Sequence, residues 1–297
     1  MNDEGPSRYP CSGMGAPELM ALARAVTDLA LKAGRVVMSV YQARAGAQVM
    51  YKADASPVTL ADEQAEACIL EGLAALTPGL PVVAEEAVSR GVGVQVGEGA
   101  RFWLVDPLDG TREFIARNGE FTVNIALVEG GRPVLGVVLA PALPQGPALY
   151  LGVAGQGAWR ATWAPGEAWA DASLSLPERG APWQPIAARA APPQGITVVG
   201  SRSHGDDQAM QAFLASRRAS LPVADHRGIG SSLKFCLLAA GEADLYPRLG
   251  RTMEWDTAAG QAVLQSAGGR VLTLEGQPMR YGKPGFENPH FVAQGAE

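Results

Sequence analysis

The segment of this chain best suited to chemistry is the hexamer 106–111, which reads DPLDGT and follows the apolar run 102–105. It places two carboxylates, Asp106 and Asp109, three residues apart, with a glycine and a hydroxyl directly after them. Converging carboxylates repel each other and raise one another's pKa, and a hard cation such as Mg²⁺ resolves that conflict by binding their oxygens. The alternative is a surface turn, because Asp-Pro and Asp-Gly are both common in turns.

Three further acidic segments could contribute ligands, and each also has a simpler structural interpretation. Glu85 and Glu86 end a short apolar run, and they could equally be a solvated strand end. Asp256 precedes an Ala-rich helical segment, where an Asp commonly caps the helix N-terminus. Asp62 lies in the first turn of another predicted helix, where the helix dipole favours an acid. The residues alone leave both interpretations of each position open.

The first half of the chain is predicted to hold two helices and a group of strands that position these acids. Apolar residues recur at helical spacing from Pro17 to about Tyr41, and a second helix follows Thr59, which brackets its first turn together with Asp62. Short apolar runs predict strands at 81–84, 102–105, 121–128 and 134–139, with a glycine-rich loop at 91–100 and a turn at 130–131.

The second half alternates between strand and helix patterns. Strands are predicted at 196–199, 222–226, 243–246 and 270–274, and helices at 206–217, 231–240 and 256–267. Such alternation is typical of an α/β domain with a mainly parallel or mixed sheet.

These patterns divide the chain into four parts. Residues 1–16 are rich in Gly, Pro and Ser, and we expect them to be a mobile tail. Residues 17–160 form the predicted N-terminal α+β metal-binding domain, and residues 196–297 form the C-terminal α/β substrate-binding domain. Between them, residues 161–195 hold much Ala, Pro and Trp with little periodicity, and we interpret them as a connector or irregular excursion.

The composition excludes several classes of protein. The chain has 297 residues, a formal net charge of −6, 47% apolar residues and 18% charged residues, which is ordinary for a soluble globular protein. This acidic balance provides no basic field for a nucleic-acid duplex or an anionic membrane, and no apolar run is long enough to predict a transmembrane segment. Three widely spaced cysteines indicate neither a disulfide framework nor a metal motif. We expect a cytoplasmic protein, with peripheral attachment at the inner membrane left open.

The segments that carry these motifs together resemble a known superfamily. Segments 52–62, 85–86, 106–111 and 230–260 are similar to those of the lithium-sensitive, Mg²⁺-dependent phosphatases that include inositol monophosphatase and fructose-1,6-bisphosphatase, over roughly residues 17–290. Segments 109–114, 201–204, 231–236, 243–248 and 255–260 resemble the bacterial 3′(2′),5′-bisphosphate nucleotidases, which convert adenosine 3′,5′-bisphosphate to AMP and phosphate. The resemblance implies a layered αβαβα sandwich.

The resemblance also implies a site for two or three Mg²⁺ ions. The positions that match metal ligands are Glu85, Asp106, the backbone carbonyl of Leu108, Asp109 and Asp256. Asp62 matches the acid that helps Thr111 to activate the attacking water, and Glu85 is counted with them as a catalytic residue. No histidine falls in these motifs, which agrees with a hard metal and argues against zinc. Lithium is expected to inhibit by occupying one Mg²⁺ position.

The substrate is expected to lie between these acids and a few placed donors. The substrate-binding positions that the resemblance implies are Gly110, Thr111, His204, Gly230, Lys234 and Asp256. Backbone N–H groups of Gly110 and Thr111 would hold the phosphate where a helix begins. Lys234 would neutralise a second phosphate, and its alternative is a solvated helix charge. A lone histidine such as His204 is more often a structural hydrogen-bonding residue.

Three functions remain open at this point. The leading one is a Mg²⁺-dependent 3′(2′),5′-bisphosphate nucleotidase acting on a small phosphate substrate as a monomer or homodimer. The second is an inositol or sugar monophosphate phosphatase with the same metal core, which the residues 112–114 (REF) disfavour. The third is a non-enzymatic phosphate-ligand binding protein, which should have lost at least one acid of the metal site. Arg112 and Arg251 stand where relatives are expected to have Lys and Pro.

Overall fold

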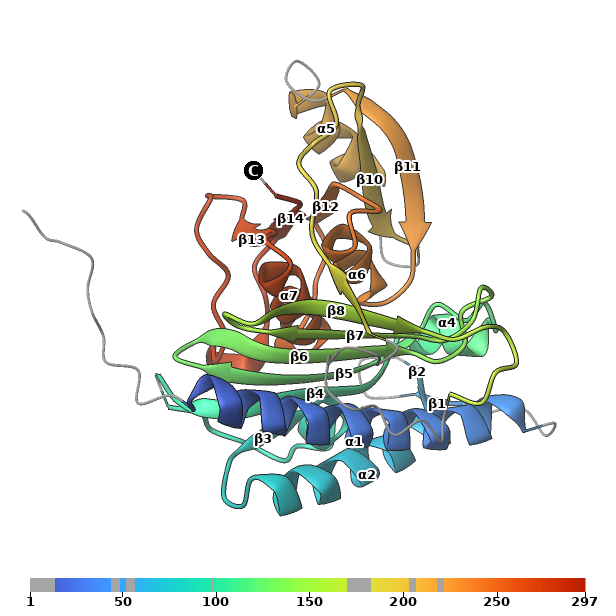
Figure 1. Cartoon of the computed structure of the whole chain (residues 1–297), viewed down its shortest axis with the longest axis vertical. Coiled ribbons are helices and arrows are strands. Elements are labelled where there is room, and N and C mark those ends of the chain that lie inside the picture. The colour runs from blue at the N-terminus through green and yellow to red at the C-terminus, as the bar shows by residue number, and fades with distance from the viewer. Residues whose placement is uncertain are drawn as a thin grey trace, which may run out of the picture.

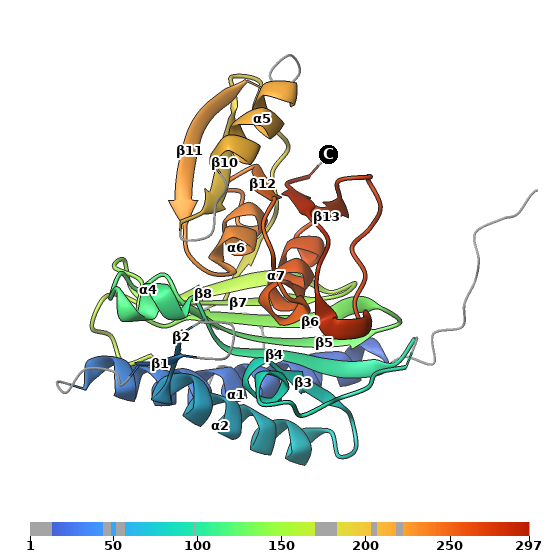
Figure 2. The same cartoon turned by 180° about the vertical axis from the view of Figure 1, so that it is seen from behind.

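The computed structural model describes residues 14–43, 49–51, 57–97, 99–169, 183–202, 207–217 and 222–296. These residues form alternating layers of helices and sheets (Figures 1 and 2). A helix pair, a seven-stranded sheet, a second helix pair, a five-stranded sheet and one outer helix follow each other through the molecule. The predicted αβαβα sandwich is therefore confirmed.

The outer helix pair consists of α1 (Ala16–Gln42) and α2 (Leu60–Leu76), which pack side by side against the seven-stranded sheet. Their apolar residues recur at helical spacing and are buried in one core with the facing side of the sheet. A short antiparallel ribbon of β1 (Val49–Tyr51) and β2 (Pro57–Thr59) leads into α2. Thr59 N donates to Asp62 Oδ2 (2.7 Å), so the predicted start of this helix is confirmed.

The seven-stranded sheet is antiparallel except for its first pair of strands. In spatial order its strands are β3 (Val82–Ala84), β4 (Arg101–Asp109), β5 (Thr122–Glu129), β6 (Arg132–Ala140), β7 (Ala148–Val153), β8 (Gly157–Thr162) and β9 (Gln184–Ile186). The strands predicted at 121–128 and 134–139 are thus confirmed, with residues 130–131 between them.

Two sequence predictions near the acids were wrong. The strand predicted at 102–105 does not stop before the hexamer 106–111, because β4 continues as far as Asp109 and keeps pairing with β5, with an irregularity of register between Asp106 and Asp109. The helix α4 (Thr111–Ile115) then begins directly. Glu85 does not end a strand but begins the short helix α3 (Glu85–Ser89). Long-range strand pairing and a five-residue helix leave little periodic trace in a sequence.

The second half forms a mixed five-stranded sheet, as the sequence predicts. Its strands in spatial order are β11 (Val223–Ile229), β10 (Ile196–Ser201), β12 (Leu245–Arg248), β14 (Phe291–Gln294) and β13 (Arg270–Thr273). The predicted helices appear as α5 (Asp207–Arg217), α6 (Leu233–Ala239) and α7 (Glu254–Ser266). The strand β14 was not predicted, and it pairs antiparallel with both β12 and β13.

The helix α7 lies between the two sheets and packs very closely on the seven-stranded one. Gly136 on β6 and Gly152 on β7 allow this approach, because a Cβ atom at either position would collide with the backbone of α7 at Ala259 or Val263. The close contact fixes where the N-terminus of α7, with Asp256, meets the end of β4.

Part of the segment expected as an irregular connector is regular. β9 lies within 161–195 and extends the seven-stranded sheet by pairing with β8. Residues 170–182 of that segment, and residues 1–13 of the expected tail, lie outside the described residues. The division of the chain into domains at 160 and 195 stays a prediction.

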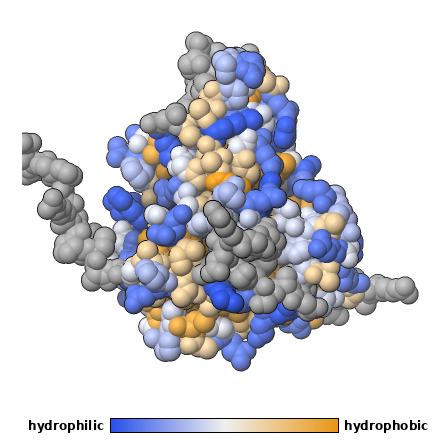
Figure 3. All heavy atoms as spheres, viewed as in Figure 1, coloured by the Kyte–Doolittle hydropathy of each residue, from blue (hydrophilic) through white to orange (hydrophobic). Residues whose placement is uncertain are grey.

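The face of the molecule in Figure 3 mixes hydrophilic and apolar residues over both sheet layers. In the part of the chain that the structure describes, no helix combines the length and the apolar character needed to cross a bilayer.

Candidate active site

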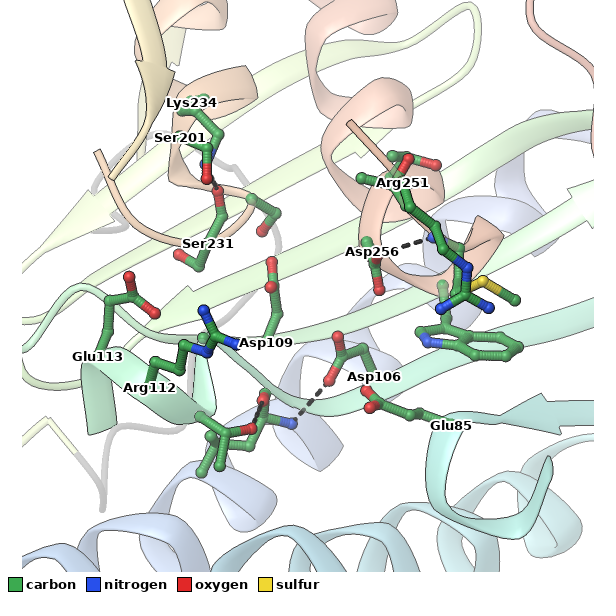
Figure 4. Close-up of a pocket in the computed structure, with 18 of the residues that line it drawn as sticks. Glu85, Asp106, Asp109, Arg112, Glu113, Ser201, Ser231, Lys234, Arg251 and Asp256 are labelled. Atoms are coloured by element: carbon green, nitrogen blue, oxygen red, sulfur yellow. Dashed lines mark hydrogen bonds between the residues drawn. The ribbon is translucent and has the colours of Figure 1, made fainter. Parts of the chain in front are cut away.

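A cavity of about 500 Å³ opens where β4, α3, α4, α6, β12 and α7 meet. Glu85, Asp106 and Asp256 point toward one another on one side of it (Figure 4). Lys234 lies across the cavity from them, and Asp109 lies between. The part of the cavity with these three acids is called its acidic side and the part with Lys234 its basic side, and residues far apart in the chain build each of them.

Three carboxylates form the centre of the acidic side. One oxygen each from Glu85, Asp106 and Asp256 lies within 4.8 Å of the other two. They come from α3, β4 and α7, three separate elements. Such a distance allows one ion to contact all three side chains, which is what the sequence prediction of a shared metal site requires.

The protein alone leaves these carboxylates in an unfavourable environment. Burial raises the pKa of Asp106 well above its ordinary value, and the negative charges of Glu85, Asp109 and Asp256 raise it further. Burial and the same kind of repulsion also raise the pKa of Asp256. A bound cation would reverse this balance, because it favours the ionised form of every acid around it.

The backbone of the hexamer is fixed by its own side chains. Leu108 N donates to Asp106 Oδ1 (3.0 Å), so Asp106 and the Leu108 carbonyl keep a constant relative position. Asp109 lies outside the group of three, but it lines the same cavity and accepts from Asn124 Nδ2 (3.3 Å). Burial raises the pKa of Asp109 to about 6, although the nearby Lys234 charge acts in the opposite direction.

Asp62 and Thr111, 49 residues apart in sequence, meet at the edge of the cavity. Thr111 Oγ1 donates to Asp62 Oδ1 (3.2 Å), while Asp62 Oδ2 accepts from both Thr59 N (2.7 Å) and Thr59 Oγ1 (2.6 Å). The capping of α2 therefore holds one oxygen of Asp62, and the other oxygen faces the hydroxyl. The two interpretations of Asp62 left open by the sequence are compatible.

Asp256 shows the same combination of roles. Met253 N donates to Asp256 Oδ2 (2.8 Å) at the N-terminus of α7, yet the side chain also belongs to the group of three acids. A helix N-terminus is thus used to orient a carboxylate, which the dipole of the helix further stabilises.

Glu66 is a functional position that the sequence analysis missed. It lies one helical turn after Asp62 on α2 and is almost wholly buried. Its carboxylate accepts from Glu86 N (2.7 Å), and it forms an ion pair with Arg90 Nη2 (2.7 Å). Glu66 therefore holds the beginning of α3, where Glu85 stands. A second acid four residues after Asp62 was the pattern that could have indicated it.

Lys234 is more deeply buried than a solvated helix charge could be. Only 3% of its surface is exposed, and its Nζ donates to the carbonyl oxygens of Ile229 (3.1 Å) and Ser231. Burial lowers the pKa of Lys234 to about 8, although nearby carboxylates, Asp109 foremost, act in the opposite direction. Lys234 therefore fixes the loop 229–231 while it places a positive charge at the cavity.

Arg248 is a second basic residue at the cavity, and no role was assigned to it from the sequence. It ends the buried strand β12, and only 8% of its surface is exposed. Its Nη2 donates to the carbonyl of Arg251 (2.8 Å), but the buried Nε has no hydrogen-bond partner within the protein. Arg248 therefore adds a second positive charge at the cavity, and this charge acts on both Lys234 and Asp256.

Of the predicted substrate-binding positions Gly230 and His204, the structure describes only Gly230. Gly230 N already donates to Glu120 Oε2 (2.7 Å), and a Cβ atom at this position would lie 2.5 Å from the Glu120 carbonyl oxygen. Glycine is therefore required here for packing. His204 lies outside the described residues, so its assignment stays a prediction.

Comparison with known proteins places the chain in a family. The model of the inositol monophosphatase family matches residues 18–295, nearly the whole chain. The 3′(2′),5′-bisphosphate nucleotidase CysQ of Escherichia coli strain K12 is 44% identical over 270 residues, which cover 90% of this chain and 96% of that protein. The chain belongs to the inositol monophosphatase family. The family predicted from the motifs is thus confirmed.

Solved structures of family members have the same fold. CysQ from Bacteroides thetaiotaomicron, described as a bacterial member of the inositol monophosphatase family, has a TM-score of 0.72 and 36% identity, covering 94% of this chain and 98% of that one. Inositol monophosphatase from Anabaena has a TM-score of 0.66 at 24% identity, which supports the fold alone.

The donor set of this family member suits a hard divalent cation. The three acids that share a site offer only oxygen, and no imidazole or thiolate from the described residues joins their group. Their repulsion and burial, in a cavity that Leu108 also lines, fit a hard cation better than a soft metal. The acidic cluster can hold a metal ion.

Proposed function

We propose that this enzyme is a Mg²⁺-dependent 3′(2′),5′-bisphosphate nucleotidase that hydrolyses the 3′-phosphate of adenosine 3′,5′-bisphosphate to AMP and phosphate. The observation that carries the proposal is the cavity with two opposite sides. Its acidic side suits a metal-assisted phosphoryl centre, and Lys234 and Arg248 on its basic side suit a second phosphate. The similarity to curated CysQ nucleotidases over 90% of the chain supports the same substrate.

Glu85, Asp106, Asp109, Asp256 and the Leu108 carbonyl would hold two or three Mg²⁺ ions. When bound, Mg²⁺ supplies charge neutralisation on the phosphoryl group and acidifies the attacking water. The carboxylates themselves hold their positions through β4 and the two helix N-termini. Gly110 and Thr111 line the cavity where α4 begins, and their backbone N–H groups would bind the phosphoryl oxygens.

Thr111 and Asp62 are assigned the proton chemistry. Because Thr111 Oγ1 donates its hydrogen to Asp62 Oδ1, its lone pairs are oriented to accept a proton from the attacking water. Asp62 would take up the hydroxyl proton in turn. The donors at Thr59 hold the Asp62 carboxylate in place for this step.

The basic side is assigned to the phosphate that remains on the product. Arg248 lines the cavity, and the charge of its guanidinium attracts phosphate oxygens. Lys234 adds a charge beside it. A monophosphate lacks this second anionic group and would bring no counter-charge to Lys234 and Arg248, which disfavours an inositol or sugar monophosphate as the main substrate.

The test compares the release of phosphate from adenosine 3′,5′-bisphosphate and from inositol 1-phosphate, with Mg²⁺ present. We expect a higher kcat/KM for the nucleotide and AMP as its product; faster release from the inositol ester would favour the monophosphatase. The variant Asp109→Asn tests whether phosphate release depends on the proposed metal site. If Mg²⁺-stimulated release persisted in that variant, the proposed site would be wrong.

Lithium inhibition and a cytoplasmic location are parts of the same proposal. A millimolar concentration of lithium should lower the rate in competition with Mg²⁺. An unchanged rate would contradict the assignment of the ion sites. Whether the enzyme works as a monomer or a homodimer would be decided by its mass in solution.

A further inference from the structure

The cavity wall formed by residues 251–257 is held by a loop that lies about 30 residues further along the chain, residues 280–288. Asn288 makes the central contacts. Its backbone N–H donates to the Thr252 carbonyl (2.9 Å), and its Nδ2 donates to the Met253 carbonyl (2.7 Å) and to Thr257 Oγ1 (3.0 Å). These bonds fix the backbone on both sides of Asp256.

A buried ion pair joins the same loop to the start of α7. Glu254 has no exposed surface, and it stands two residues before Asp256. Its carboxylate accepts from Gly282 N (2.7 Å), from Lys283 N (3.0 Å) and from Lys283 Nζ. Lys283 Nζ also donates to Asn288 Oδ1 (3.3 Å) and thereby connects the ion pair to the contacts of Asn288.

One residue of this loop has a strained backbone conformation that the contacts of the loop with α7 maintain. Phe286 has a φ of +57°, a left-handed value that is unfavourable for a residue with a Cβ atom. Its ring packs on Trp255, with ring centroids 6.3 Å apart. Trp255 lies directly between Glu254 and Asp256, so the strained loop contacts the start of α7 from a second direction.

The charge of Lys283 explains how an additional acid is tolerated here. Glu85, Asp106 and Asp256 already repel one another, and Glu254 is a further buried carboxylate that stands two residues before Asp256 in the chain. An uncompensated buried charge is strongly unfavourable, and the local backbone would shift to expose it. With Lys283 in place, Glu254 instead bonds two backbone N–H groups of the loop, and the start of α7 keeps its geometry.

We propose that Lys283 is a positioning residue that, acting through Glu254 and Asn288, sets Asp256 in the geometry required of a metal ligand. The inference rests on the proposed function, because it assumes that Asp256 binds the ion. The inference adds that the affinity of the site for metal depends on the loop 280–288, which contributes no ligand to the site. Partners of this kind typically change metal affinity by about 10–100-fold.

The experiment measures Mn²⁺ binding directly, by titration of metal-free protein followed by electron paramagnetic resonance. We expect Lys283→Met to weaken Mn²⁺ binding by about tenfold. The double variant Glu254→Gln/Lys283→Met should recover most of that loss, because it removes the buried charge that Lys283 compensates. Arg280→Met is the matched control on the same loop, since the Arg280 side chain bonds the Gly130 carbonyl instead, and it should change binding less than twofold.

A purely structural role would give a different result. In that case Lys283→Met would lower the melting temperature with Mn²⁺ affinity unchanged, and the double variant would be no better than the single one. Either result would overturn the proposal. If Lys283→Met does not fold, Asn288→Ala decides, since it keeps the ion pair and should still weaken Mn²⁺ binding severalfold. Wild-type affinity in that variant would also overturn the proposal.

The failure of the proposed function can be recognised separately. If the wild-type protein itself bound no Mn²⁺, the assignment of the metal site would be wrong. If the wild type bound Mn²⁺ and all variants bound it equally well, only the role of Lys283 would be excluded.

Discussion

The acidic and basic sides of the cavity differ in how their residues are held. On the acidic side, Asp106 belongs to a paired strand of the seven-stranded sheet, and Asp62 lies in the first turn of a long helix. On the basic side, Lys234 bonds the carbonyls of loop 229–231, and Arg248 bonds the carbonyl of Arg251. All four residues stand on regular elements, because Lys234 lies in α6 and Arg248 ends β12, but the two basic residues also hold neighbouring loops through backbone carbonyls.

This difference suggests a division of tasks. Attack on phosphorus requires fixed distances between ions, water and substrate, which regular elements preserve best. Recognition of a second phosphate tolerates some movement, because a cation attracts an anion from several directions. Asp256 belongs to the acidic side, but it accepts a hydrogen bond from Met253, and Met253 is in turn held by the loop 280–288. Asp256 therefore depends on both a regular element and a loop.

The largest effect should follow loss of an acid on the sheet. Asp106→Asn removes one ligand and its charge, and we expect kcat to fall by about 10³-fold. The metal-free protein should at the same time become more stable, because one of the repelling acids is gone. Phosphate release at saturating Mg²⁺ and thermal unfolding with chelator measure the two effects. Asp225→Asn, an exposed acid paired with Arg227, should change neither.

A smaller and more selective effect should follow loss of a basic residue. Arg248→Met should lower kcat/KM for adenosine 3′,5′-bisphosphate by about 10–100-fold, the loss expected for a hydrogen bond to a charged group. Adenosine 3′-monophosphate, which lacks the second phosphate, should be affected much less. Arg227→Met is the control, since Arg227 is exposed, pairs with Asp225 and does not line the cavity. Equal losses for both substrates would place Arg248 in the chemical step instead.

The role of Glu66 in positioning Glu85 should change the Mg²⁺ requirement of the enzyme without changing its kcat. Glu66→Gln weakens the cap of α3, and we expect the Mg²⁺ concentration for half-maximal rate to rise about tenfold while kcat at saturation stays within twofold. Arg101→Met, which breaks the ion pair with Glu129 at the start of β4, is the control and should shift that concentration by less than twofold. A fall in kcat that high Mg²⁺ does not restore would contradict a positioning role.

The smallest effect should be the difference in melting temperature between the Mg²⁺-bound and the metal-free protein. At tenfold excess over its Kd, Mg²⁺ should raise the melting temperature by about 3 °C, since binding to the folded state alone stabilises it. Thermal unfolding with and without chelator measures the shift. A melting temperature that is unchanged or higher in chelator would contradict the electrostatic description of the acids.

The same shift should depend on pH in a defined direction. In the metal-free protein the pKa of Asp109 is raised to about 6, and those of Asp106 and Asp256 are also raised. The folded state then binds more protons than the unfolded state above pH 4, so its stability falls as the pH rises toward 6. Mg²⁺ competes with these protons, so its stabilisation should be larger at pH 7.5 than at pH 5. The opposite trend would exclude the buried acids as its source.

The sequence was sufficient for most elements and for the acids themselves. Apolar spacing predicted α1, α2 and the alternating second half, because periodic burial is a local property of helices and strands. The hexamer 106–111 predicted converging acids, and three of the four acids assigned to the metal share one site. The helix α3 was not predicted, and of α4 only its beginning at 110–111 was expected, since five residues are too few for a periodic pattern.

The amino-acid sequence by itself determined the types of donor in this protein: oxygen ligands at fixed spacings, a capping Thr59 before Asp62, and a chain too acidic to attract nucleic acid. Only the tertiary structure decided their arrangement. Glu66 accepts a hydrogen bond from the start of α3, 20 residues further along the chain, and Lys283 pairs with Glu254, which lies 29 residues before it. Arg248 is buried beside the cavity between the layers. Such contacts depend on packing between layers, and no local pattern in a chain records them.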